Sequence, residues 1–398
     1  MSDFLKSEVV VNTALGLLIR DITLGALVWS DAVGDFAGAK NDTITIRLPA
    51  YAPADKRTLR SGAARNKSEL FERSVDVKLD VDVYKDVPIT DEQLTLDITD
   101  FGAQVLNPVM GGIGEGLEDE IAAVMTDATY RTTLTHDLSA DDPYKTVVTA
   151  RKYLNDANVP FAGRYLAVGS DFEAALLNSE KFVRVDQSGS DQTLREAKIG
   201  RIAGFDVYTI PGFPPDFCVA GHKTAFAMGQ RAPQVPAGAP WGASANYQGM
   251  AVRTVRVFDA DEVEDRFIAD AWIGVTDVKD DGYWLGGKFI PAVEPGATFG
   301  DEVDLATSAA SDDIIDTATP HGLSIGDGIQ FTELTGGTGL TADTTYYVVS
   351  TSFGASTLRV AATPGGAALG FSADITAGKI ALVDTEQLVR AVKIVSVA

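Results

Sequence analysis

The sequence contains few of the side chains that most often carry catalysis or hold metals. Its 398 residues include one cysteine, Cys218, and three histidines, His136, His222 and His321. A lone cysteine excludes an intramolecular disulfide framework and a cysteine-rich zinc site, and its apolar neighbours predict a buried strand position. Three histidines in separate segments leave few ways to form a histidine metal site or a Ser-His-Asp triad.

Nucleotide-binding and catalytic motifs are missing as well. The sequence has no phosphate loop ending in Gly-Lys-Ser/Thr and no Gly-x-Ser-x-Gly nucleophile elbow. Gly112, Gly114 and Gly116 lie in a helical pattern with the wrong spacing for a dinucleotide loop, so we predict a packing role for them. The same pattern carries four acids, and without a histidine or cysteine beside them we interpret these as a solvated or interface-facing helix surface rather than a cation site. These acids are Glu115, Glu118, Asp119 and Glu120. We therefore predict no catalytic residues, no cofactor and no metal.

Long apolar runs and positive charge are also scarce. The most apolar N-terminal stretch, residues 14–29, is interrupted by Arg20 and Asp21 and follows no basic segment, so we predict neither a membrane span nor a signal peptide. The chain has 33 Lys and Arg against 56 Asp and Glu, a net charge of −23. Such a surface repels polyphosphate, which disfavours sequence-specific DNA binding but suits a wall that encloses DNA without adhering to it.

The clearest pattern in the sequence is a long alternation of apolar and polar residues. Thr43–Leu48 and Val75–Val83 both alternate with period two, which predicts strands with one dry and one wet face. We interpret them as the two arms of one long hairpin. In a monomer this hairpin would expose unpaired edges and an apolar stripe, whereas in an assembly the stripe would meet the next subunit. The stripe consists of Val75, Val77, Leu79, Val81 and Val83.

A basic tip lies between the two arms, within residues 49–74. No acid occurs from Lys56 to Lys67. In a strongly acidic protein, cations gathered in this way predict a contact with acidic residues of an adjacent copy, which would set the register of the contact. An ordinary surface hairpin with a solvated basic tip is the alternative when the hairpin is considered alone. The tip consists of Lys56, Arg57, Arg60, Arg65 and Lys67.

The rest of the chain is predicted to be α+β. Apolar residues recur at intervals of three and four over residues 91–130, which predicts a long helix starting near Pro88-Ile89-Thr90-Asp91-Glu92 and bent or weakened by Pro108 and its glycines. Residues 142–157 predict a second helix. From Tyr165 onward short strands and helices alternate without a regular repeat. Beyond Gly300 frequent turn signals indicate a small β-sandwich or barrel, and residues 388–395 predict one more strand.

In this order, the hairpin, the helix and the α+β segment resemble the major capsid proteins of tailed phages, the Hong Kong 97 fold, over about residues 1–290. The strings that resemble the family most are residues 90–96 (TDEQLTL), 100–106 (DFGAQVL), 202–207 (IAGFDV) and 221–227 (GHKTAFA). The resemblance implies a division of the chain into segments. These are an N-terminal arm (1–40), an extended loop (41–88), a peripheral domain with a spine helix (89–145), a mainly axial domain (146–262), a return to the peripheral domain (263–299), a small β-domain expected on the outer surface (300–385) and a final strand that returns to the core (386–398).

The same resemblance implies a structural role without enzymatic activity. The protein would self-assemble into hexamers and pentamers of an icosahedral shell around double-stranded DNA, in the virion, after assembly in the host cytoplasm. A portal and a scaffolding protein are the implied assembly partners, and no membrane is involved. Because the sequence begins at the arm, we expect the scaffold to be separate or already removed.

The resemblance also raises the question of crosslinking and leaves two alternative functions open. Some members of the family crosslink through a loop Lys and an Asn, and Lys56, Lys67 and Asn66 lie in this loop. Because no catalytic acid can be assigned, we expect no crosslink. A nanocompartment shell of the same fold is the nearest alternative function. A secreted hydrolase with a β-sandwich binding module is a more distant one, since it requires a signal peptide and a catalytic set.

Overall fold

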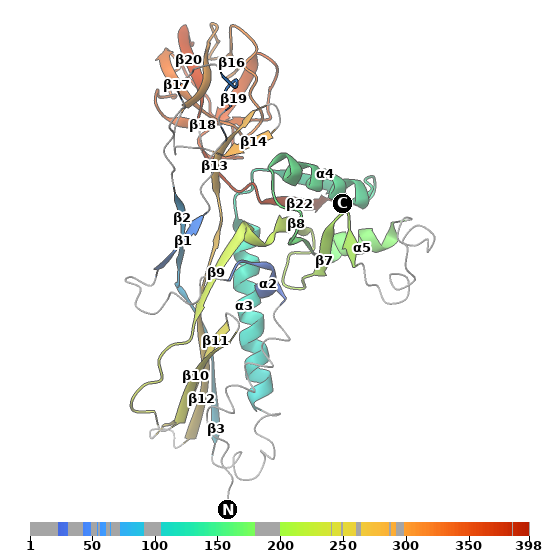
Figure 1. Cartoon of the computed structure of the whole chain (residues 1–398), viewed down its shortest axis with the longest axis vertical. Helices are drawn as coiled ribbons and strands as arrows, with labels where there is room; N and C mark the ends of the chain where they lie inside the picture. The colour runs from blue at the N-terminus through green and yellow to red at the C-terminus, as the bar shows by residue number, and fades with distance from the viewer. Residues whose placement is uncertain are drawn as a thin grey trace, which may run out of the picture.

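A computed structural model describes most of the chain, and it is an elongated α+β molecule (Figure 1). This confirms the predicted fold class. No helix in the described part is long and apolar enough to cross a membrane. The described residues are 23–30, 43–48, 54, 56–60, 64, 72–90, 105–179, 200–239, 241–247, 250–259, 264–285, 288–291, 298–383 and 385–397. Most of the predicted N-terminal arm, residues 1–22 and 31–40, lies outside them.

The long axis of the body is formed by helix α3 (Asn107–Asp127) and the antiparallel sheet beside it (Figure 1). The strand order is β10-β11-β12-β3, and β9 also pairs with β12. The strands are β3 (Val81–Thr90), β9 (Phe226–Arg231), β10 (Trp241–Tyr247), β11 (Met250–Asp259) and β12 (Glu264–Asp277). Met110, Ile113, Leu117, Ile121 and Met125 bury one face of α3 in the largest hydrophobic cluster. Burial of side chains of this size contributes about 1.5–3 kcal/mol each, so this seam fixes the helix on the sheet.

The N-terminal part of the predicted helix differs from the sequence-based expectation. Pro88, Ile89 and Thr90 belong to β3, so the helix start predicted there is wrong; residues 91–104 lie outside the described part. Pro108 lies near the start of α3, directly after the π-helical residues Val105 and Leu106, so the predicted bend at Pro108 stays a prediction. A Cβ on Gly116 would lie 2.8 Å from Cγ1 of Val83, so the predicted packing role of the glycines is confirmed there.

The hairpin formed by β1 and β2, called the hairpin arm below, is shorter than the alternation of apolar and polar residues predicted. Strand β1 (Thr43–Leu48) pairs antiparallel with β2 (Arg73–Lys78), which ends where β3 begins in a different sheet, opposite β12. The nine alternating residues Val75–Val83 are therefore two strands with different partners. Each of the two strands has one buried face. Alternation with period two predicts which face of a strand is buried, but it does not predict with which other strand it pairs.

The second half of the body is a six-stranded sheet covered by helices. Its order is β4-β22-β8-β5-β7-β6, in which the last strand of the chain, β22, is parallel to β4 and antiparallel to β8. Helix α4 begins as predicted, with Asp142 accepting a hydrogen bond from the N–H of Tyr144 at 3.1 Å. Cys218 is 0% exposed in β8, which confirms its predicted position. The elements are β4 (Thr133–Asp137), α4 (Pro143–Asp156), β5 (Arg164–Val168), α5 (Ser170–Asn178), β6 (Arg201–Ile202), β7 (Phe205–Thr209), β8 (Phe217–His222) and β22 (Ala391–Val397).

A β-barrel lies at one end of the molecule (Figure 1). Its strand order is β15-β20-β17-β18-β19-β16, and a bridge from Leu305 to Thr317 closes the ring. Closure pairs the outer strands, so the barrel offers few free edges. The strands are β15 (Thr298–Asp304), β16 (Ile315–Asp316), β17 (Gly328–Thr335), β18 (Thr345–Val349), β19 (Thr357–Ala361) and β20 (Ala377–Val383). A small sheet of β13 (Asp280–Leu285), β14 (Lys288–Pro291) and β21 (Thr385–Gln387) lies between barrel and body.

Candidate assembly surface

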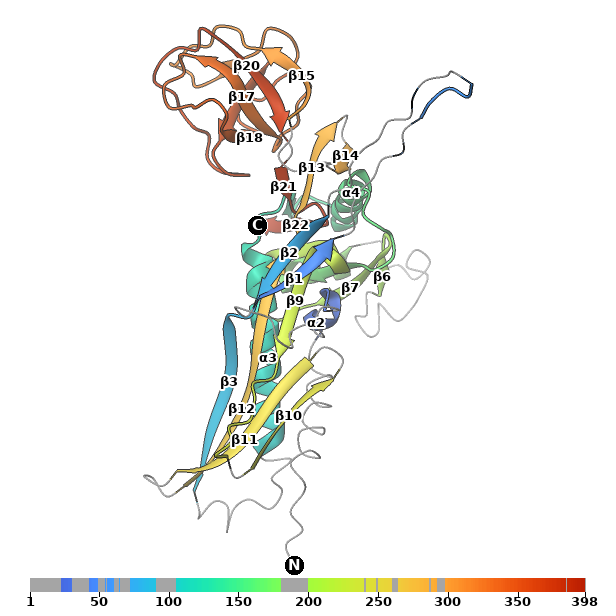
Figure 2. The same ribbon diagram turned by 60° about the vertical axis from the view of Figure 1, so that its left-hand side comes forward.

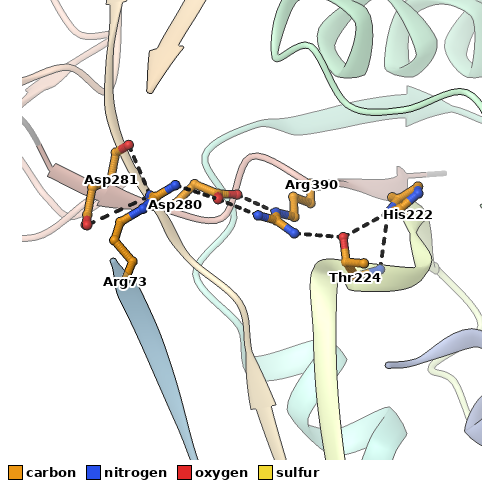
Figure 3. A network of polar contacts seen from close by, with 6 residues as sticks. All are labelled: Arg73, His222, Thr224, Asp280, Asp281 and Arg390. Atoms are coloured by element: carbon orange, nitrogen blue, oxygen red, sulfur yellow. Dashed lines mark hydrogen bonds and ion pairs between the residues drawn. The ribbon is translucent and has the colours of Figure 1, made fainter. Parts of the chain in front are cut away.

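The hairpin arm is joined to the body by a network of buried polar contacts (Figure 3). Arg390, just before β22, donates from Nε and Nη2 to the two carboxylate oxygens of Asp280 at 2.5 and 2.6 Å. Arg73 of β2 approaches the same carboxylate at 3.6 Å and that of Asp281 at 3.8 Å. The side chains of Arg73 and Asp280 are only 12% and 8% exposed. One carboxylate in β13 therefore connects the arm to the last strand of the chain.

The network continues through a threonine to a histidine (Figure 3). Arg390 donates from Nη1 to Oγ1 of Thr224 at 2.8 Å, and this oxygen lies 2.9 Å from Nδ1 of His222. Nε2 of His222 lies 2.8 Å from the carbonyl oxygen of Ala162, which can only accept, so Nε2 carries the proton and Nδ1 accepts. Burial lowers the pKa of His222, and the nearby Arg390 lowers it further. The neutral imidazole therefore fits this position.

The predicted apolar stripe faces the interior of its own chain. Val77 is 1% exposed and packs in a cluster with Ile44, Ile46 and Leu48 of β1. Val75 and Leu79 are partly buried against the same cluster. The last two members of the stripe, Val81 and Val83, are partly buried against the cluster under α3. The five residues of the stripe are thus divided between the cluster around Val77 and the cluster under α3. Only the four that are partly exposed, all except Val77, could contact a neighbouring subunit.

The basic tip is described in part. Lys56, Arg57 and Arg60 are exposed, and so is Leu59 between them, at 84%. Their segment, residues 56–60, lies away from the body, at the upper right of Figure 2. Arg65 and Lys67, together with Asn66, lie outside the described residues. The structure therefore brings three of the five predicted cations together on one projecting segment.

Three acids are exposed in and after the second strand of the arm. Asp76 lies in β2, Asp80 between β2 and β3, and Asp82 in β3, with the exposed Lys78 among them. Asp76 accepts a hydrogen bond from Oγ1 of Thr45 at 2.6 Å. Burial, followed by the nearby Asp270, raises the pKa of Asp82, which means that an added positive charge would stabilise this carboxylate. The chain thus carries a basic segment and an acidic strip on different parts of its surface.

Sequence reasoning missed an anchor for the N-terminal segment. Oε1 of Glu118 in α3 accepts hydrogen bonds from the backbone N–H groups of Thr23 and Leu24, the latter at 3.0 Å, at the start of α2 (Leu24–Leu27). A carboxylate at a helix N-terminus satisfies unpaired donors. The prediction of a solvated or interface-facing Glu118 is therefore wrong. No local spacing signals this contact, because the partners are 94 and 95 positions apart.

Within the described ranges, no group of three or more His, Cys, Asp or Glu is placed to hold a metal ion.

Comparison with known proteins identifies the fold. No family model matches the sequence, and no curated protein matches it. A solved structure described as Mycobacterium phage Che8 matches with a TM-score of 0.50 and 21% identity, covering 64% of this chain and 87% of that one. The capsid structure of the Cyanophage P-SCSP1u matches with a TM-score of 0.49 and 10% identity, covering 64% and 84%. A virus-like particle from Pyrococcus furiosus matches with a TM-score of 0.40 and 10% identity, covering 67% and 92%.

The match to the Che8 structure shows that the two chains share a fold. The fold is that of the Hong Kong 97 type, and the resemblance inferred from the sequence is confirmed at this level.

Proposed function

We propose that this chain is the subunit of a closed protein shell of the tailed-phage type, a structural protein rather than an enzyme. The observation that carries the proposal is the fold match, which spans 87% of the Che8 chain. In a shell of this kind the copies associate through unlike patches, which close into rings of six and five. The finer proposal is an icosahedral virion capsid that encloses double-stranded DNA and is assembled in the host cytoplasm with a scaffolding protein and a portal.

The segments of the chain receive roles within this proposal. The hairpin of β1 and β2 corresponds to the extended loop, and α3 to the spine helix of a peripheral domain that also includes β3, β11 and β12. The sheet of β4, β22, β8, β5, β7 and β6 corresponds to the axial domain. The barrel is assigned to the outer surface. Its charge supports this position, because residues 298–383 hold 10 acids and 2 bases, a net of −8, and would repel DNA inside a shell.

The contact between copies is proposed to join the basic segment to the acidic strip. Lys56, Arg57 and Arg60 of one copy would meet Asp76, Asp80 and Asp82 of the next. Both groups are exposed, and they have opposite charge. Each surface ion pair contributes only about 0.2–1 kcal/mol, so the contact would select the register of neighbouring copies more than it strengthens their association.

Electron microscopy of the purified protein tests the proposal. We expect closed polyhedral particles of uniform size, alone or after co-expression with the neighbouring genes for shell assembly. Packaged double-stranded DNA would support the capsid assignment, whereas a protein cargo would assign the shell to a nanocompartment. A strictly monomeric elution profile with hydrolytic turnover would contradict the shell and favour the secreted hydrolase.

A further inference from the structure

We propose that the C-terminal barrel is a hinged module, held in one orientation against the body by a single buried latch, Arg131 with Asp327. This inference concerns the chain itself and does not depend on the shell assignment. It rests on the separation of the hydrophobic cores, on the geometry of the latch and on the way in which the chain enters and leaves the barrel.

The barrel and the body have separate cores. The cluster inside the barrel, around Phe331, Ile329 and Leu358, contains only residues 303–380. No hydrophobic cluster among the described residues includes side chains from both barrel and body. Instead, a cavity of about 1090 Å³ lies between them, lined on the body side by Lys152 and Tyr153 of α4 and on the barrel side by Tyr347 and Pro364. An interface of this kind contributes little apolar burial to hold the barrel in place.

One ion pair crosses this interface in the part of the chain that the structure describes. Nη2 of Arg131, in the connection from α3 to β4, lies 3.0 Å from Oδ1 of Asp327, and the two side chains are 8% and 1% exposed. The guanidinium lies 5.4 Å from the ring centre of Trp284 in β13. Gly326, with a φ of +86°, lets the barrel backbone approach, since a Cβ there would collide with Nη1 of Arg131. The loop before β17 is therefore shaped around this one side chain.

The latch selects one docked orientation. Burial raises the pKa of Asp327 even though Arg131 is adjacent, and burial lowers the pKa of Arg131, so each charge depends on its partner once it is out of water. Nη1 of Arg131 is buried and has no hydrogen-bond partner among the described atoms. A buried donor left in this way loses its hydrogen bonds to water without replacing them. The docked orientation is therefore the one that pairs both buried charges, while any other docked orientation would leave a buried charge unpaired.

The covalent connections permit rotation. Thr298, at the start of β15, and Val383, at the end of β20, are paired residues on neighbouring strands. The chain thus enters and leaves the barrel side by side, at one end. Released from Arg131, the barrel would be attached to the body at this end alone, and it could turn about it without losing any of its own strand pairing.

Distance measurements between two spin labels test the hinge in the unassembled full chain. Labels are attached to Thr344→Cys in the barrel and Lys145→Cys in α4, both exposed, while the native Cys218 is 0% exposed and does not react. The parent chain should give one narrow distance distribution. Asp327→Asn and, separately, Arg131→Met should broaden it by about twofold or add a second maximum. The matched control is Glu302→Gln, which removes an ion pair with Lys379 inside the barrel and should leave the distribution unchanged.

Two results would overturn the hinge. A distribution that stays narrow in both latch variants would mean that other contacts hold the barrel, and a broad distribution in the parent chain would mean that the latch does not hold it. Circular dichroism separates release from unfolding, because the released barrel keeps its β-spectrum. Asp327 also accepts a hydrogen bond from the N–H of Ser324 at 2.7 Å in the turn before β17. Arg131→Met leaves the barrel sequence intact, so broadening in this variant cannot come from damage to that turn.

Discussion

Arg390 donates to both oxygens of the Asp280 carboxylate, although the two residues are 110 positions apart in the chain. The pair lies where β13 passes the start of the last strand. It shares its carboxylate with Arg73 of the arm, so one acid is neutralised by two bases from opposite ends of the sequence. The body's stability and the arm's orientation therefore depend on the same group.

Removal of Arg390 should lower stability strongly. We expect Arg390→Met to reduce the free energy of unfolding by about 3–5 kcal/mol, because it leaves Asp280 buried with a more distant partner. Urea titration followed by tryptophan fluorescence measures the change. The control is Lys288→Met, which removes the more exposed ion pair with Asp156 and should cost less than about 1 kcal/mol. Equal losses in the two variants would contradict the network's importance.

Removal of Arg73 should loosen the arm selectively. Arg73→Met cuts the ion pairs from β2 to Asp280 and Asp281 while leaving the contact of Arg390 in place. Amide hydrogen exchange should accelerate in β1 and β2, by about tenfold or more if 1.4 kcal/mol of local protection is lost. Exchange in β5 and β8 should not change. Unaltered protection of the arm would show that the apolar cluster around Val77 holds it without the ion pairs.

Reversal of the basic tip should block or misdirect assembly. The variant Arg57→Glu, Arg60→Glu, Arg65→Glu should remain folded and yield few or aberrant particles, because like charges would meet at the proposed contact. Lys145→Glu in α4, an exposed charge reversal away from the tip, is the control and should assemble normally. Partial rescue by Asp76→Arg and Asp80→Arg would identify the partner strip. Normal particles from the tip variant would rule this contact out.

Two glycines of α3 should respond in opposite ways to alanine. Gly116→Ala places a methyl group against Val83 and should destabilise the protein by about 1–3 kcal/mol through overpacking. Gly112 has nothing within 4 Å of its added Cβ, so Gly112→Ala should stabilise the helix by about 0.5–1 kcal/mol. Thermal unfolding of the two variants side by side measures the difference. Shifts in the same direction would contradict the close approach of α3 and β3.

Acid should weaken the protein through its buried histidines. Burial lowers the pKa of His222 and of His136 below the ordinary value of 6.5. The unfolded chain then binds protons more readily than the folded one, so stability is present above pH 6.5 and declines as pH falls toward the lowered values. Thermal midpoints between pH 7.5 and pH 5 should fall, and His222→Gln should reduce the slope. A slope unchanged in this variant would assign the pH dependence to other groups.

The sequence predicted most of the secondary structure, because the period of apolar residues records which face of each element is dry. It predicted α4 and the buried strand that contains Cys218 for this reason. It did not reveal that residues 75–83 belong to two different sheets, because strands in both sheets show the same alternation of apolar and polar side chains.

The polar contacts were beyond local reasoning. Arg73, Asp280 and Arg390 carry no motif, and their contact depends on three strands meeting. Glu118 looked like one of four solvated acids, and only the position of α2 distinguishes it from its neighbours. The basic tip was visible in the sequence because its charges are consecutive, whereas a partner on another copy leaves no such trace.

The place of β22 between β4 and β8 means that the barrel is an insertion and not an appendage. During synthesis the ribosome must complete residues 298–383 before residues 391–397 exist to fill the gap in the sheet. Until then β4 and β8 lack their shared partner. The body therefore completes its folding after the barrel has been synthesised. A stop codon anywhere in the barrel would remove β22 and leave a gap in the body sheet between β4 and β8, rather than produce a smaller working subunit.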